Sequence, residues 1–377
     1  MKKKIIALAL ASSCAAPLAL ADVTIYGVMS ASLESVQATG GTATLPSRTR
    51  VADNNSRIGF KGSEDLGNGL KSIWQIESSL KYFEQGGVND ANQSATFATR
   101  NTFVGLDSAK LGTVQIGLYD SAYKRLTNGG VNVMGDTAAD IDGSSKNVAA
   151  IFSRGEARLS NSVHYTSPLL AGFQGGISYG VDETNTPKRN RLSLAGQYNW
   201  QGFQIAAGWD HSANTGGYLG YYNGANAVVG DAGGSVNFSK LVASYKFASG
   251  TYLGAGVERG SYDVAGSSAM SQTGWTLAAT QDIGAATLKA SYSRLGSLSN
   301  TASPDDYKST EWVLGASYNL SKRTSVFSYY ARINNKALAN VDFANTPLYT
   351  TGSGTSSPTL AAGNRLSAFG LGMKVLF

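Results

Sequence analysis

The chain has 377 residues, 15% of them charged and 45 of them glycine, whereas soluble domains average roughly 25% charged residues and 7% glycine. Its 42% of hydrophobic residues and 7 prolines exclude a disordered chain, and the lack of about 18 consecutive apolar residues after position 21 excludes a single transmembrane-helix protein. The formal net charge of +6 comes from 31 basic and 25 acidic residues that are scattered along the chain, which gives no support to nucleic-acid binding.

Residues 1–21 have the pattern of a secretory signal peptide. Three lysines at positions 2–4 precede the apolar stretch Ile5–Ala11, and Ala19–Ala21 is a small-x-small cleavage site. We therefore expect the mature chain to start at Asp22, and the loss of three basic residues lowers its formal charge from +6 to +3. The single cysteine, Cys14, lies in this segment, so we expect no disulfide or thiolate metal site in the mature protein. A lipoprotein acylated at Cys14 is the less favoured alternative.

From Val23 onward, apolar and polar residues alternate with a period of two, which predicts β-strands. Val23, Ile25 and Leu33 fall on one face of the first strand, whereas Thr24 and Glu34 fall on the other. The same alternation recurs as far as the C-terminal stretch Phe369–Phe377, and the apolar faces carry no charge. We predict sixteen strands, which start near Val23, Ser56, Leu70, Thr99, Thr113, Arg158, Phe173, Arg191, Phe203, Ser239, Thr251, Gly274, Ala286, Ser309, Ser325 and Asn364.

The connections between the predicted strands distinguish a membrane barrel from a soluble sandwich. Short, turn-rich links alternate with longer polar ones, the longest at 81–98, 121–157, 211–234 and 335–363. This asymmetry is typical of an all-β, antiparallel transmembrane β-barrel with short periplasmic turns and long extracellular loops. A barrel of about 16 strands is too wide for side chains to fill, so we expect one domain over 22–377 that encloses a water-filled channel.

Four stretches also carry a family resemblance. Ser56–Lys71 (SRIGFKGSEDLGNGLK), Phe103–Val114, Asn161–Pro168 and Tyr318–Thr324 resemble the Gram-negative general-diffusion porins of the trimeric kind. The resemblance implies a homotrimeric porin in the outer membrane of a Gram-negative bacterium, through which ions and small hydrophilic solutes diffuse passively. It also implies contact with outer-membrane lipid and lipopolysaccharide, and a third extracellular loop, about 120–157, that folds inward and narrows the channel.

The two ends of the mature chain add to the resemblance. Tyr26-Gly27 and Phe377 match the family, in which a terminal aromatic residue is an assembly signal for the outer-membrane insertion machinery. Two departures stand beside these matches: Leu118 replaces an arginine that such porins often carry, and Val375-Leu376 replaces a His-Arg pair.

The candidate functional residues are charges that line the pore. Basic residues predicted to face inward form one set, and the charged residues of the third loop form a second set with several acids. An acidic loop opposite a basic wall would create a transverse field, whereas charges that pair with one another would only tether the loop. Inward positions carry more basic than acidic residues, which predicts a weak anion preference. The wall residues are Arg57, Lys61, Arg100, Arg158, Arg191 and Arg332, and the loop residues are Asp120, Asp136, Asp140, Asp142, Lys124 and Arg125.

Enzyme motifs are not supported. Gly176–Gly180 fits G-x-S-x-G, but that motif requires a strand-to-helix turn and here it falls inside a predicted strand. The two histidines, His164 and His211, have no spaced partner for a metal. We therefore expect no enzyme, no cofactor and no metal. An outer-membrane enzyme and an adhesin are the alternatives from other classes, and a solute-specific channel is the alternative within transport.

Overall fold

A computed structural model describes residues 22–41, 44–80, 97–142, 150–182, 189–214, 234–263, 266, 268–348 and 361–377. The predicted signal peptide, residues 1–21, lies outside the described residues, as do parts of all four long connections. Among the helices of the described part, none is long and apolar enough to cross a membrane.

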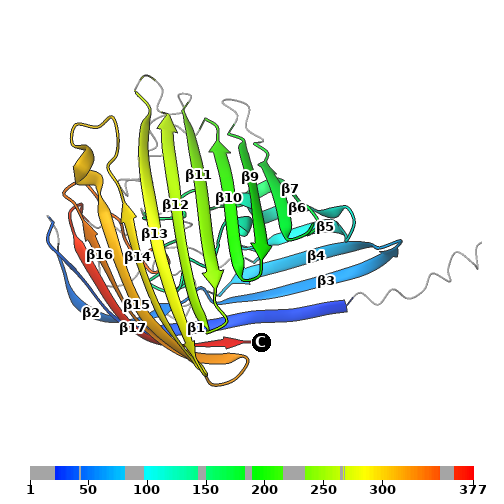
Figure 1. Ribbon diagram of the computed structural model, residues 1–377, viewed down its shortest axis with the longest axis horizontal. Helices are drawn as coiled ribbons and strands as arrows, with labels where there is room; N and C mark the ends of the chain where they lie inside the picture. The colour runs from blue at the N-terminus through cyan, green and yellow to red at the C-terminus, as the bar shows by residue number, and fades with distance from the viewer. Residues whose placement is uncertain are drawn as a thin grey trace, which may run out of the picture.

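One antiparallel sheet closes on itself through pairing of its first and last strands (Figure 1). Seventeen labelled strands form it, but β2 and β3 pair with successive halves of β1 and so share one position, which confirms the predicted 16-stranded barrel. The strands are β1 (Asp22–Thr39), β2 (Leu45–Asp53), β3 (Arg57–Gly67), β4 (Leu70–Ser79), β5 (Thr102–Ser108), β6 (Gly112–Asp120), β7 (Arg158–Thr166), β8 (Phe173–Gly180), β9 (Arg191–Trp200), β10 (Phe203–Ser212), β11 (Ser235–Lys246), β12 (Thr251–Asp263), β13 (Met270–Ile283), β14 (Ala286–Leu295), β15 (Ser309–Asn319), β16 (Thr324–Asn335) and β17 (Arg365–Leu376).

The break between β2 and β3 is a feature that the sequence pattern did not predict. Asn55 there has a φ of 59°, and the Ser30 N–H donates to Ser56 Oγ at 3.0 Å, so a side chain replaces the interrupted ladder. The predicted second strand started near Ser56 and omitted β2. The reason is local, because Pro46 and the polar residues after it hide the alternation that β1 enforces through pairing.

The two faces of the barrel follow the predicted alternation. Leu33 is 56% exposed on the outside, whereas Glu34 is completely buried inside. The outer face is apolar around the sheet, with Ile116 and Leu314 among its exposed residues. A closed barrel with an apolar outer surface leaves no unpaired strand edge, which is the condition for crossing a bilayer with strands.

One predicted wall residue points the other way. Arg332 pairs with Trp312 on the outer face and is exposed, whereas its neighbours Ala331 and Ile333 are buried inside. The assignment of Arg332 to the pore wall was therefore wrong. The physical reason is that the inward side of β16 is apolar here, since it packs against chain segments that fill part of the lumen.

The barrel closes next to the C-terminus. The Gly27 N–H donates to the Phe377 carbonyl at 2.9 Å, and the Phe377 N–H donates to the Gly27 carbonyl at 3.1 Å. The Phe377 ring occupies the space over Gly27, where an added Cβ would lie 2.3 Å from the ring. Figure 1 shows the C-terminus at the end of the barrel that the β15–β16 turn also reaches.

Candidate functional site: the barrel lumen

The connection after β6 enters the barrel directly. Its described residues, 121–142 and 150–157, are called the inner segment below. The segment starts with a short helix, α2 (Ala122–Leu126), whose N-cap Ser121 accepts the N–H of Lys124. The next N–H groups, of Ala122 and Tyr123, donate at 2.9 Å to inward-facing serine hydroxyls of β8 and β9. The start of α2 is thus fixed against the inner wall.

A buried ionic cluster holds the end of the inner segment. Arg154 Nε lies 3.1 Å from Glu258 Oε2 on β12, and both side chains are completely buried. Tyr123 donates its hydroxyl to Glu258 Oε1 at 2.6 Å, so both ends of the segment share one carboxylate. On β11, Lys240 pairs with Glu156 at 2.5 Å.

The middle of the inner segment reaches a distant part of the wall. Asn55 Nδ2, beside β3, donates to Asp136 Oδ1 at 2.6 Å, and Arg57 NH1 lies 3.5 Å from Asp136 Oδ2. In the strand order of the closed sheet, β3 and β11 are half a circumference apart. The inner segment therefore crosses the lumen between Lys240 and Arg57.

A second chain segment also lies inside the barrel, which the sequence did not predict. Residues 336–348, called the second inner segment, follow β16, and Val341, Phe343 and Leu348 are buried in one cluster with Met134 of the inner segment. Asn345 Nδ2 donates to the Asp136 carbonyl at 2.8 Å. The sequence signal for this second inner segment was a group of apolar residues within a connection that is otherwise polar.

Arg50 fastens the second inner segment to the wall. Its guanidinium donates to the Pro347 carbonyl at 2.7 Å, while Nε lies 2.8 Å from Glu34 on β1. Arg50 belongs to β2, which the sequence analysis omitted, so its role could not be anticipated.

Most of the predicted charges are paired. Every predicted wall arginine that faces inward lies within 4 Å of a carboxylate, and two of these four carboxylates, Asp120 and Asp136, belong to the predicted loop residues. Such pairing favours the tethering interpretation, because the two charges of a close pair largely cancel at longer range. The pairs are Arg57–Asp136 at 3.5 Å, Arg100–Glu77 at 2.6 Å, Arg158–Asp120 at 3.2 Å, Arg191–Asp210 at 2.7 Å, Lys124–Asp120 at 3.8 Å and Lys124–Asp142 at 3.9 Å.

A smaller group of inward cations makes no ion pair with any described residue. Lys61 lies over the Tyr26 ring at 5.3 Å, and Arg125 lies over the Tyr119 ring at 4.9 Å. Lys289 on β14 and Lys374 on β17 complete the group. At the turn end, Lys71 lies between Asp65 and Asp107 in the strand register, so it adds no net positive charge there.

Three carboxylates of the inner segments have altered acidity, and burial is the largest cause in each; for Glu156 it raises the pKa to about 8. Burial raises the pKa of Asp140 to about 7, and the negative charge of Asp142 adds to the effect, although backbone N–H groups of Asp136 and Asp142 oppose it. Burial also raises the pKa of Asp342 to about 7. Asp140 and Asp342 therefore both change charge near neutral pH.

The G-x-S-x-G serine does meet a histidine, but not in a catalytic arrangement. Ser178 Oγ lies 2.7 Å from His164 Nδ1, and the other ring nitrogen lies 2.7 Å from Ser162 Oγ. A hydroxyl therefore occupies the place that an acid takes in a catalytic triad. Ser178 and His164 are completely buried, and α2 binds Ser178 through the Ala122 N–H. Within the described ranges, no cluster of His, Cys, Asp or Glu could hold a metal ion.

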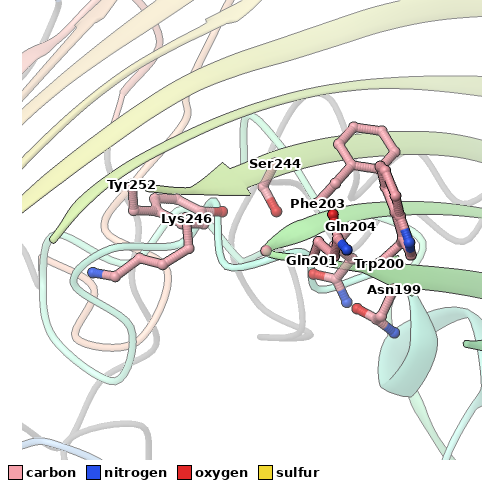
Figure 2. A pocket seen from close by; sticks show the side chains of 9 residues that line it. Asn199, Trp200, Gln201, Phe203, Gln204, Ser244, Lys246 and Tyr252 are labelled. Atoms are coloured by element: carbon pink, nitrogen blue, oxygen red, sulfur yellow. The ribbon is translucent and has the colours of Figure 1, made fainter. Parts of the chain in front are cut away.

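A pocket of about 350 Å³, lined by both polar and aromatic residues, lies near the short β9–β10 turn. Figure 2 shows Gln204, Ser244, Lys246 and Tyr252, from β10, β11 and β12, around it. Lys246 is paired with Asp282 at 2.6 Å. The pocket has hydrogen-bonding walls suited to water, which fits the mouth of an open barrel.

Comparison with known proteins gives a consistent result. Residues 6–338 match a family described as Gram-negative porin. A major outer membrane protein P.IB of Neisseria meningitidis serogroup B is 33% identical over 340 residues, which cover 86% of this chain and 91% of that protein. The corresponding protein of Neisseria lactamica is 32% identical over 338 residues, with the same coverage of both chains.

Two solved structures have a similar fold. An anion-selective porin from Comamonas acidovorans superposes with a TM-score of 0.73 at 20% identity, covering 95% of this chain and 100% of that one. OmpT, an outer membrane protein of Vibrio cholerae, superposes with a TM-score of 0.66 at 16% identity, covering 95% of this chain and 98% of that chain.

Proposed function

Because this chain belongs to the Gram-negative porin family and forms a channel for passive diffusion across the outer membrane, we propose that its two inner segments together form the narrowest part of that channel. One observation supports this proposal: the inner segment crosses the lumen from Lys240 to Arg57, whose strands lie half a circumference apart in the barrel. As in other channels for passive diffusion, the solutes of this channel are ions and small hydrophilic molecules. Membership of this family makes the protein a channel rather than an enzyme.

The second inner segment offers a direct test of the narrowing. Asn334 and Arg365 pair across β16 and β17, so a short glycine-serine turn can replace 337–362 without disturbing either strand. We expect a higher single-channel conductance and entry of larger neutral polymers. The matched control is the same replacement at 299–306, a stretch that has no buried residue and includes the start of the 3₁₀ helix η1 (Pro304–Tyr307). Unchanged conductance in the first variant would refute the proposed narrowing.

We propose further that the channel prefers anions weakly. The support comes from Lys61, Arg125, Lys289 and Lys374, which have no acidic partner among the described residues, rather than from the arginines, which are paired. Rings of basic residues favour anions. Asp140 and Asp342 oppose this preference only in part, because each is partly protonated near pH 7.

We propose that the working form is a homotrimer. Support comes from the family itself and from a structural relative, OmpT of Vibrio cholerae. The trimer form of OmpT superposes on this chain with a TM-score of 0.63. Native mass measurement in mild detergent should give three chains per particle. A monomer under conditions that preserve channel activity would contradict this assembly.

A further inference from the structure

Three arginines on the outer face of the barrel lie on alternate strands and take no part in the channel. Arg259, Arg294 and Arg332 lie on the alternate strands β12, β14 and β16, and all three are exposed. In each strand the residues on both sides of the arginine are buried, so the arginine itself points outward. None of the three makes an ion pair within the described part of the chain, and two donate only to neutral oxygens, of Ser271 and Asn334.

The three arginines lie at one height. Each is the ninth residue of its strand, counted from Thr251, Ala286 and Thr324 at the short-turn end, and the three strands run in the same direction. Eight steps of about 3.3 Å along strands tilted by 35–45° place them roughly 20 Å from that end. The apolar band of such barrels is about 25 Å tall, so the row lies near its extracellular edge. Alternate strands separate neighbouring arginines by about 10 Å.

Aromatic side chains fill the positions between the arginines. Trp275 on β13 pairs with Arg294, and Trp312 on β15 pairs with Arg332. Tyr292 connects the two tryptophans, with ring centroids 5.3 Å from Trp275 and 4.3 Å from Trp312. Tryptophan and tyrosine concentrate where acyl chains meet polar headgroups. The row therefore alternates arginine and tryptophan at the level of the lipid headgroups.

The charge of this row needs a partner from outside the chain. An arginine on the lipid face is tolerated near the interface but is not stabilised there by acyl chains. Glu258 on β12 and Glu311 on β15 face inward, and Asp305 is paired with Lys308 at 2.7 Å. Asp263 faces outward on β12, but it lies four residues beyond Arg259 and accepts a hydrogen bond from Ser235 at 2.9 Å. Arginine matches phosphate in particular, because its planar guanidinium donates two parallel hydrogen bonds to it.

We propose that Arg259, Arg294 and Arg332 form a binding site for a phosphorylated lipid of the outer leaflet, with the headgroup chemistry of lipopolysaccharide. The phosphates lie against the arginines, and the acyl chains cover the apolar surface below them, which includes Val257, Leu277 and Leu314. The family resemblance implies lipopolysaccharide contact in general, whereas the strand register assigns it to one face.

The test measures the affinity of the purified channel in detergent for lipopolysaccharide and for the same lipopolysaccharide without its lipid A phosphates. The variant is Arg259→Gln/Arg294→Gln/Arg332→Gln, and the control is Lys110→Gln/Lys322→Gln/Arg323→Gln, which removes the same charge from exposed turns. A basic residue near an anionic surface contributes about 1 kcal/mol, so we expect roughly 5-fold weaker binding per arginine and a loss on the order of 100-fold in the triple variant. The control should bind as the unmodified protein does.

Dephosphorylated lipopolysaccharide needs no variant and should bind the unmodified channel as weakly as intact lipopolysaccharide binds the triple variant. Equal affinity of the triple variant and the unmodified protein would overturn the proposal, as would equal affinity for the two lipids. Dissociation of the oligomer in the triple variant would assign the row to subunit contact and would also overturn it. Channel conductance is measured in parallel and should not change, which separates this site from the proposed narrowing.

Discussion

At the scale of single residues, Arg154 is a charged side chain that is completely buried, and its partner Glu258 is equally inaccessible. Four donors reach the Glu258 carboxylate: the Tyr123 hydroxyl, the backbone N–H and the Nε of Arg154, and the Gly155 N–H. Arg154 also donates to the Gln272 carbonyl at 2.9 Å. Replacing such a pair by apolar residues can be neutral, whereas removing one partner leaves an uncompensated buried charge. The cluster therefore fixes the position of the inner segment and also contributes to the stability of the barrel.

Arg154→Met should lower the free energy of unfolding by about 3–5 kcal/mol, because Glu258 then remains buried without its cation. Urea unfolding in detergent measures the change, and Arg323→Met in an exposed turn is the control. The double variant Arg154→Met/Glu258→Gln should recover part of the loss, since no charge is left unpaired. Equal stability of Arg154→Met and the unmodified protein would show that the cluster does not hold the inner segment.

Residue by residue, the direction of side chains was predictable where lipid or water is the only neighbour. Leu33 and Glu34 follow the period-two rule, and so do Arg57 and Lys61. Arg332 does not, because the inward side of β16 packs against chain rather than water. The rule of apolar outside and polar inside fails at β16, where apolar residues of the inner segments fill part of the lumen.

At the scale of elements, the strands were predictable and the paths of the long connections were not. Each strand is determined by alternation and by its neighbours, whereas the position of the inner segment depends on distant partners such as Asn55 and Asn345. Nothing local in 121–157 specifies those partners. The second inner segment was missed for the same reason, because its apolar residues are few and its anchor, Arg50, lies in an unpredicted strand.

Acid should strengthen the anion preference of the channel. The pKa values of Asp140 and Asp342 are raised to about 7, so both carboxylates lose their charge as the pH falls from 8 to 6, and the lumen becomes more positive. The acids nearest Asp140 are Asp136, Asp142 and Glu311. Reversal potentials measured across this range should shift toward anions.

The control for this pH dependence is Asp140→Asn/Asp342→Asn, which should lie closer to the acid-form preference at pH 8 and keep only the part of the pH response that belongs to Glu156, whose pKa burial raises to about 8. A full pH response in that double variant would assign the titration to other groups. The same variant leaves the arginine pairs of the wall in place.

The residue that follows β17, Phe377, takes part in the closure of the barrel and is also the proposed assembly signal. Phe377 exchanges two backbone hydrogen bonds with Gly27 and covers it with its ring. Deleting Phe377 should reduce the amount of inserted, heat-modifiable protein, whereas Phe377→Ala keeps the backbone bonds and isolates the effect of the ring. Insertion of the deletion variant at the normal level would refute the role of this residue in assembly.

At the scale of the whole molecule, the barrel encloses a lumen whose charges fall into two classes. The wall arginines Arg57, Arg100, Arg158 and Arg191 are paired with carboxylates, while Lys61, Arg125, Lys289 and Lys374 remain without acidic partners among the described residues. The sequence predicted the excess of basic residues, but it could not separate the two classes, because pairing depends on where the inner segment crosses.

The most direct test of this account is the reversal potential of single channels in a KCl gradient, at about 0.1 M and about 1 M salt, where the screening length is about 10 Å and 3 Å. The account predicts an open, ohmic channel with a weak anion preference that fades as salt rises. Lys289→Gln/Lys374→Gln should move the low-salt reversal potential toward zero, and Lys110→Gln/Lys322→Gln should not. A cation preference at low salt, or a reversal potential that the first pair of substitutions leaves unchanged, would contradict the account.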